Sequence, residues 1–293
     1  MEKFLQLTLT GLTNGAILAL VALGFVLIYK ASDVINFAQG NFLTVGAFLA
    51  YAFVIQIGLP WTIGVLLTLI AAVLLGVVVE RFILRPMIGE PIISVIMVTI
   101  GLASVLTAFV NAIWGTTGRA FPSFLPSTPL NIFGAIISAD RLIALTLVAI
   151  LLIIFMLFFR FSKEGIAMRA TADDQQAALS MGISVKKVFA MAWSISAVVA
   201  AIAGIIVANI IGLNATALAS FGLRVFPVVI LGGLDSIPGA IVGGIIIGLL
   251  EVYTAGYTPP ELGLSQVIPF IVLILILMVK PYGIFGEVRI ERV

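Results

Sequence analysis

The sequence contains no cysteine and no histidine in its 293 residues. These absences exclude disulfide bonds, thiol nucleophiles, haem ligation through histidine and the usual zinc sites. Charged residues are also scarce, at 10% of the chain against about 25% in a typical soluble domain. The formal net charge of +2 gives no electrostatic basis for binding nucleic acid. We therefore expect no enzyme activity, no metal site and no nucleic-acid partner.

Apolar residues make up 62% of the sequence and occur in long runs without charge, with a mean hydropathy of +1.30. A helix that crosses the hydrocarbon core of a bilayer needs about 20 mainly apolar residues. The segments that meet this requirement are residues 4–29, two within 34–79 that separate at 58–60, 92–113, 142–159, 188–209, 226–250 and 262–279. Continuous apolar runs favour helices over the alternating strands of a membrane barrel. The sequence therefore predicts an all-α bundle of about eight transmembrane helices, forming one membrane-embedded domain over residues 1–293.

Basic residues gather in three segments, which the positive-inside rule places in the cytoplasm. They are Arg81 with Arg85, the loop 160–187, and the tail from Lys280. Three predicted segments separate the loop from the tail, so three simple crossings would put these two on opposite sides. The conflict disappears if the interrupted run 226–250 is re-entrant or crosses as two short pieces. An ordinary kinked helix with a wrongly assigned tail is the alternative.

Three amides follow the first predicted helix, at Asn36, Gln39 and Asn41. Asn36 and Gln39 are three residues apart and would share one face of a helix. These side chains either line a polar cavity on a translocation path or join helices through hydrogen bonds of about 0.6–2 kcal/mol each. The sequence leaves both alternatives open.

A glycine-rich break at 232–239 interrupts the seventh apolar run. It contains four further candidates for the translocation path: Gly232, Gly233, Asp235 and Ser236. An ionisable side chain at membrane depth suggests function, although Asp235 is predicted to cap the following half-helix, where a carboxylate is favourable. Glu251 stands alone near the end of its helix, and we expect an interfacial position for it.

The loop 160–187 contains a short predicted helix at 172–181. Asp173 and Asp174 would lie in its first turn, and Gly182 would end it. Ala177, Ala178 and Met181 would then present a small apolar surface to a partner protein.

Several motifs, taken together and in order, resemble the branched-chain amino acid group of ABC-type importer permeases. They are Asn36-Phe-Ala-Gln-Gly40, Arg85-Pro86 followed by Thr99-Ile-Gly101, Arg169-Ala170 with Ala177 and Gly182-Ile183, the glycine-rich stretch 231–248, and Lys280-Pro-Tyr-Gly-Ile-Phe-Gly286. Lys280 replaces a more usual arginine, and Gln39 stands where histidine is common. The matches extend over nearly the whole chain.

The resemblance implies a coupling loop that docks on an ATPase. The residues of this chain that match it or flank the match are Arg169, Ala170, Asp173, Asp174, Ala177, Ala178, Met181 and Gly182. Such permeases bind no ATP themselves, and this sequence has no phosphate-binding Gly-x-x-x-x-Gly-Lys-[Ser/Thr] motif. We therefore expect no cofactor in this chain.

The resemblance also implies the partners: a second, similar permease, two ATP-binding subunits and an external solute-binding protein, assembled in the cytoplasmic membrane of a bacterium. The implied substrates are branched-chain or hydrophobic amino acids, with urea, amides or other amino acids as the alternative. An ion-coupled secondary transporter is disfavoured, because its candidate carboxylates at Asp33, Asp235 and Glu251 all lie near expected interfaces.

Overall fold

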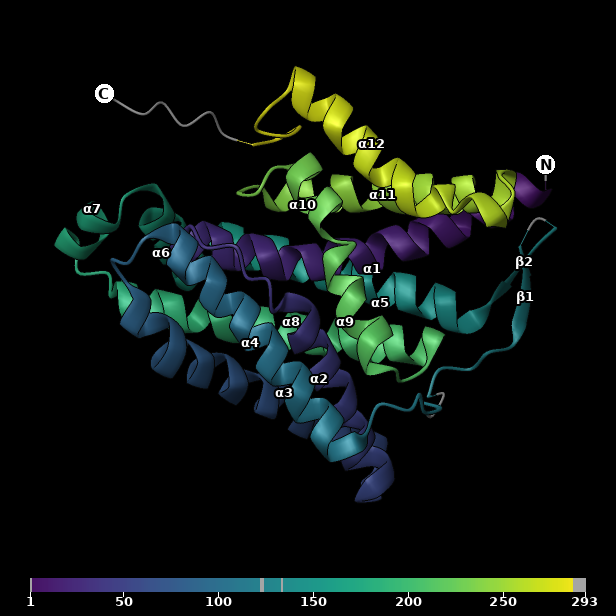
Figure 1. Ribbon diagram of the computed structural model, residues 1–293, viewed down its shortest axis with the longest axis horizontal. Helices are drawn as coiled ribbons and strands as arrows, with labels where there is room; N and C mark the ends of the chain where they lie inside the picture. The colour runs from purple at the N-terminus through teal and green to yellow at the C-terminus, as the bar shows by residue number, and fades with distance from the viewer. Residues whose placement is uncertain (1, 122–123, 133, 287–293) are drawn as a thin grey trace. The chain divides into compact units, whose positions relative to one another are not determined.

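The structure is a computed structural model that describes residues 2–121, 124–132 and 134–286 (Figure 1). Its α-helices are α1 (Glu2–Ser32), α2 (Gln39–Tyr51), α3 (Trp61–Val79), α4 (Ile92–Trp114), α5 (Ala139–Phe161), α6 (Lys163–Asp173), α7 (Gln175–Ser180), α8 (Val185–Ile211), α9 (Ala215–Leu223), α10 (Phe226–Gly232), α11 (Ile237–Tyr257) and α12 (Leu264–Val279). The π-helices η1 (Ala52–Gln56) and η2 (Glu80–Leu84) extend α2 and α3, and η3 (Arg85–Met87) and η4 (Pro260–Leu262) are 3-10 turns. The predicted all-α bundle is confirmed.

One short β-hairpin, which the sequence did not predict, precedes α5. Strands β1 (Pro129–Ile132) and β2 (Ala135–Ser138) are antiparallel, with Pro129 opposite Ser138. It lies in the proline-rich segment between α4 and α5.

Seven helical stretches among the described residues are long and apolar enough to cross a membrane. They are Glu2–Ser32, Trp61–Met87, Ile92–Trp114, Ala139–Phe161, Val185–Ile211, Ala215–Gly232 and Ile237–Tyr257. Helix α12 is a shorter apolar helix of 16 residues. The chain is thus a multi-pass membrane protein. The run 34–79 divides near residue 58 as predicted, and Pro60 precedes α3 at a position where its missing N–H costs no helical hydrogen bond.

The described residues form two compact units. The first contains residues 2–26, 125–152 and 224–286, and the second contains residues 27–124 and 153–223, each with the gaps stated above.

Helices in the second unit pack through small residues. Helix α2 contacts α3, α4, α8 and α9, and α3 also packs along α8, as Figure 1 shows. A Cβ atom at Gly76 of α3 would lie 2.6 Å from the Cα of Ser194 in α8. The ring centroids of the buried Phe42 and Trp193 lie 6.1 Å apart and fill the space between α2 and α8. Close backbone approach of this kind is how helices associate when lipid removes the hydrophobic driving force.

In the first unit, α10 and α11 form a helical hairpin, and α12 packs against both. A Cβ atom at Gly243 would lie 2.5 Å from the Val228 carbonyl oxygen, and Gly232 meets Gly239 next to the turn. The N-terminal part of α1 contacts α11 in the same way, since a Cβ at Gly15 would lie 2.7 Å from the Gly244 carbonyl oxygen.

The predicted break at 232–239 is therefore a turn between two antiparallel helices, and the kinked-helix alternative is wrong. Helix α9 lies in the stretch after residue 209 where the sequence had suggested only a connection, and a two-residue turn at Arg224 and Val225 separates it from α10. Four apolar segments, α8, α9–α10, α11 and α12, now separate the loop 160–187 from the tail. An even number is consistent with a cytoplasmic position for both.

Candidate functional site

The loop 160–187 folds into two short helices, and the predicted single helix at 172–181 is wrong at its start. Asp173 is the last residue of α6, and Asp174 is the N-cap of α7 in an extended conformation. The Asp174 carboxylate accepts hydrogen bonds from the backbone N–H groups of Gln176 (2.8 Å) and Ala177 (2.9 Å). A carboxylate that satisfies two open N–H groups ends one helix and begins the next, whereas the sequence suggested only a favourable charge in a first turn.

The predicted end of the helix at Gly182 is confirmed. Gly182 has φ +83°, and its N–H donates to the Leu179 carbonyl (3.0 Å) while that of Ile183 donates to Ala178 (2.9 Å). This left-handed turn caps the last carbonyls of α7, and glycine adopts it without the cost that other residues incur.

The exposed surface of α7 differs from the prediction at one position. Met181 is 83% exposed and Ala177 is exposed, but Ala178 is only 3% exposed. Leu179, which the sequence did not single out, is 57% exposed and extends the apolar surface. Figure 1 shows α6 and α7 beside one end of α8, which both contact. Helix α7 has only six residues, and the side that carries the buried Ala178 packs on the rest of the protein. The opposite side is exposed and can contact a partner protein.

The two remaining loop candidates lie on α6. Arg169 is exposed, and its guanidinium donates to the Arg160 carbonyl at 3.3 Å. Ala170 is half-buried, and its carbonyl accepts from the Asp174 N–H at 3.1 Å. The first hydrogen bond holds α6 against the end of α5, and the second fixes the turn between α6 and α7.

The amides at the start of α2 form a buried network. Asn36 and Gln39 are fully buried, and the Asn36 Nδ2 donates to Gln39 Oε1 at 3.2 Å. The predicted shared helix face is wrong, because Asn36 lies in the connection between α1 and α2 and only Gln39 is helical. The Ser196 hydroxyl on α8 donates to the same oxygen at 3.0 Å. Asn41, which is 7% exposed, donates to the Ala103 carbonyl on α4 at 3.0 Å. These bonds tie α2 to α8 and α4, which supports the helix-joining alternative.

The glycine-rich turn places its cap one residue later than predicted. The Ser236 hydroxyl, not the Asp235 carboxylate, accepts from the Gly239 N–H at 3.1 Å. Because α11 begins at Ile237, Ser236 is the residue whose side chain reaches the third N–H of the helix. Gly232 and Gly233 also contact the C-terminal turn, where the Phe285 N–H donates to the Gly232 carbonyl at 3.0 Å. Close packing accounts for the glycines of this segment.

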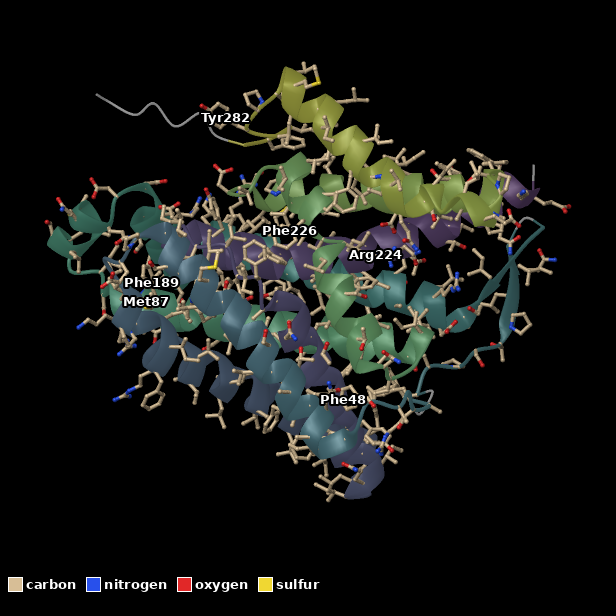
Figure 2. The ribbon with its side chains drawn as sticks, in the orientation of Figure 1. Phe48, Met87, Phe189, Arg224, Phe226 and Tyr282 are labelled. Atoms are coloured by element: carbon tan, nitrogen blue, oxygen red, sulfur yellow. The ribbon has the colours of Figure 1, made fainter. Side chains whose placement is uncertain are left out.

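Two buried carboxylates form ion pairs that the sequence interpretation missed. Glu80, 1% exposed, accepts from Arg85 Nε at 3.0 Å and Nη2 at 2.7 Å. Glu251, 7% exposed, is paired with Arg224, so it is not isolated as the sequence suggested, and its interfacial position stays a prediction. Arg224, labelled in Figure 2, is the one basic residue between Lys187 and Lys280. A lone arginine in so long an apolar stretch is itself the signal that a carboxylate partner lies nearby in the fold.

A cavity of about 130 Å³ in the second unit lies beside the first of these pairs. Its lining includes Arg85, Met87, Gln175, Phe189 and Trp193. Figure 2 shows Met87 and Phe189 together in this region. The first residue of α7 thus shares a cavity with the ends of α3 and α8.

Comparison with known proteins identifies similar chains over almost the full length. The family model described as "Branched-chain amino acid transport system / permease component" matches residues 7–277. The high-affinity branched-chain amino acid transport system permease protein LivH of Salmonella typhimurium is 30% identical over 304 residues, covering 99% of this chain and 98% of the relative. The corresponding permease BraD of Pseudomonas aeruginosa is 28% identical with the same coverage.

One solved structure has a similar fold. It is "PsaBC from Streptococcus pneumoniae in complex with Fab", with a TM-score of 0.50 and 15% identity over 93% of this chain and 90% of that chain. At this identity the similarity concerns the fold alone.

Proposed function

This chain belongs to the family of permease components of branched-chain amino acid transport systems, and we propose that it is the membrane-spanning subunit of an ABC importer for these amino acids. The match over residues 7–277 carries the proposal, because it includes the apolar spans together with the loop 160–187. Two relatives with 28–30% identity, each aligned with this chain over 98% of the relative's length, support the same assignment.

The substrate class is consistent with the physical problem that the membrane presents. A zwitterionic amino acid cannot enter hydrocarbon without losing the hydration of two charges. A permease provides a polar path that opens alternately to each side, and separate ATPase subunits supply the free energy. Urea, amides and other amino acids are the competing substrates.

The proposed coupling element is α7 with the end of α6. Asp174 and Gly182 fix the two ends of α7, while Ala177, Leu179 and Met181 form its exposed face. A short, capped helix with an exposed apolar surface is suited to dock in a groove of a partner ATPase.

The cavity next to α7 suggests how a movement would be transmitted. Gln175 of α7 lines the cavity together with Arg85 after α3 and Phe189 of α8. Displacing α7 therefore changes the packing at the ends of both spans. Packed helices respond to such shifts by moving as rigid bodies rather than by deforming.

The proposal includes the other parts of the transporter. A second, similar permease would complete the path, two ATP-binding subunits would bind ATP, and an external solute-binding protein would deliver the amino acid. The assembly would lie in the cytoplasmic membrane of a bacterium, with the loop 160–187 on the cytoplasmic side.

Replacing Gly182 with glutamate tests the coupling assignment. Gly182 and Gly58 both have positive φ values, +83° and +78°, and a Cβ atom at either would meet nothing within 4 Å. Backbone strain is therefore similar in Gly182→Glu and in the control Gly58→Glu, which changes a loop on the opposite side of the membrane. We expect both variants to insert in the membrane, and Gly182→Glu alone to lower uptake per ATP hydrolysed at least tenfold.

The measurement uses the assembled transporter in proteoliposomes, with radiolabelled leucine outside and ATP inside. Equal uptake per ATP in Gly182→Glu and the wild type would exclude α7 as the coupling element. Equal losses in the two variants would attribute the effect to backbone strain.

A further inference from the structure

An arginine and a glutamate form an ion pair within the apolar spans of the first unit. Arg224 follows α9 directly and precedes α10, near the middle of the 18-residue apolar stretch Ala215–Gly232 (Figure 2). Its Nη2 donates to Oε2 of Glu251, which lies in the span Ile237–Tyr257. The pair therefore lies at membrane depth and joins the start of the α10–α11 hairpin to the second half of α11.

The two partners differ in their exposure. The side chain of Glu251 is 8% exposed, whereas that of Arg224 is 47% exposed. An arginine at this depth is unfavourable against acyl chains, and such residues in membrane proteins face a protein partner or a water-filled path. The exposed part of Arg224 therefore requires a polar environment that lipid does not provide.

The local backbone favours a path over a protein contact. The helix is interrupted at Arg224 and Val225, between α9 and α10. Interrupted helices near the bilayer midplane are where transporters place substrate and ion sites, because irregular backbone is tolerated there only when it lines a cavity.

The charges of the pair also match the proposed substrate. An amino acid zwitterion carries one carboxylate and one ammonium group, and the pair offers one guanidinium and one carboxylate. Both are neutral overall, so the substrate can exchange partners with the pair without leaving a net charge in the membrane. The planar guanidinium is well suited to bind a carboxylate through two parallel hydrogen bonds.

We propose that Arg224 and Glu251 line the translocation path, where the Arg224 guanidinium binds the carboxylate of the passing amino acid and Glu251 meets its ammonium group. This proposal rests on the function proposed above, since it requires an amino acid as the substrate.

The alternative is a purely structural ion pair that ties α11 to the start of α10. The two roles differ in what a neutral replacement does. A structural pair can be replaced by two uncharged residues of similar size with little loss of folding stability, because neither charge then remains buried without a partner. A pair that binds substrate loses its function when both charges are removed.

Cysteine accessibility tests whether Arg224 faces water. The chain has no native cysteine, so one substitution gives a single reactive site. Arg224→Cys combined with Glu251→Gln leaves no unpaired carboxylate. Ile150→Cys in the middle of α5 is the matched control, because Ile150 is apolar and 51% exposed. We expect an anionic methanethiosulfonate reagent to modify position 224 in the assembled transporter at least ten times faster than position 150, in the resting or the vanadate-trapped state.

Equal modification rates in both states would overturn the proposal, because Arg224 would then face lipid or be covered by a partner chain. Wild-type transporter that takes up no leucine would instead contradict the proposed function.

Neutral replacement provides the second test. We expect Arg224→Gln with Glu251→Gln to lower leucine uptake per ATP hydrolysed at least tenfold, while the amount of assembled transporter stays within twofold of the wild type. The matched control is Thr8→Val with Tyr253→Phe, which removes a 2.8 Å hydrogen bond between the side chains of α1 and α11 and should leave the ratio unchanged. A wild-type ratio in the Arg224 and Glu251 double variant would show a structural pair and overturn the proposal.

A charge-preserving variant covers the case in which the double variants fail to assemble. Arg224→Lys keeps the positive charge but loses the two-pronged geometry of the guanidinium. We expect its apparent KM for leucine, measured with saturating solute-binding protein, to rise at least threefold. An unchanged KM would contradict contact between Arg224 and the substrate carboxylate.

Discussion

Two polar regions, one in each unit, have opposite properties. The amide network of the second unit is neutral and closed: Asn36, Gln39 and Ser196 are each 0% exposed and bond to one another. The pair in the first unit is charged and open, since Arg224 is about half exposed while Glu251 is buried. The first region is buried and makes its hydrogen bonds within the protein, apart from the Gln39 Nε2, whereas the second has a charged side chain that reaches the surface.

This difference distinguishes polar side chains that join helices from polar side chains that take part in transport. Amides and hydroxyls inside a membrane protein join helices when their partners lie within the protein. Arg224 differs because its charged side chain is half exposed at membrane depth, where such residues face water, substrate or another chain. Variants in the closed network should therefore reduce the amount of folded permease, whereas variants of the open pair should reduce transport.

The largest effect is expected at the helix contact that encloses the amide network. Gly204 of α8 lies against the Leu43 carbonyl of α2, so that any Cβ atom there would overlap the backbone of its neighbour. We expect Gly204→Leu to lower the amount of folded permease more than tenfold, because α2 and α8 must separate. Fluorescence-detected size-exclusion chromatography measures this amount.

Gly101→Leu is the control for that substitution, since Gly101 is also inside a helix and nothing lies within 4 Å of a Cβ there. It should leave the amount of folded permease unchanged. Normal yields of both variants would mean that the α2–α8 contact does not hold the closed network together.

A smaller effect is expected when the network loses its shared acceptor. Gln39→Leu leaves the Asn36 amide and the Ser196 hydroxyl without that acceptor, at about 1–3 kcal/mol for each buried group that stays unsatisfied. We expect the melting temperature of the purified transporter to fall by several degrees, with unchanged leucine uptake per ATP. Ser196→Ala, which removes one donor, should lower it less.

A loss of transport without a loss of stability in Gln39→Leu would contradict the structural role of the amide network. An unchanged melting temperature with a lower uptake per ATP would place Gln39 on the path. The Gln39 Nε2 is buried without a hydrogen-bond partner among the described residues. Gln39 is therefore the residue of the network at which a structural role most needs to be tested against a place on the translocation path.

The sequence predicted the helices well because membrane spans follow from local composition. Charge-free runs located every long apolar helix except the first half of the stretch Ala215–Gly232, where α9 precedes Arg224 and was taken for a connection. The turn at Gly182 was also predictable, since a left-handed residue after a helix favours glycine.

Long-range contacts were not predictable from the sequence, and they decide the roles of the candidate residues. Glu251 appeared isolated because its partner lies 27 residues away in the chain. Ala178 appeared exposed because the positions of α6 and α8 around it are not encoded in the short helix itself. Asp235 and Ser236 are both good helix caps, and only the first residue of α11 decides between them.

ATP-driven uptake in proteoliposomes tests the central claim most directly. The transporter is reconstituted with its ATPase subunits, and solute-binding protein loaded with leucine, isoleucine or valine is added outside. We predict accumulation of these amino acids only with ATP inside, and none of labelled urea. Uptake that follows an ion gradient without ATP, or that transports urea in preference to leucine, would contradict the assignment of this chain as a branched-chain amino acid permease.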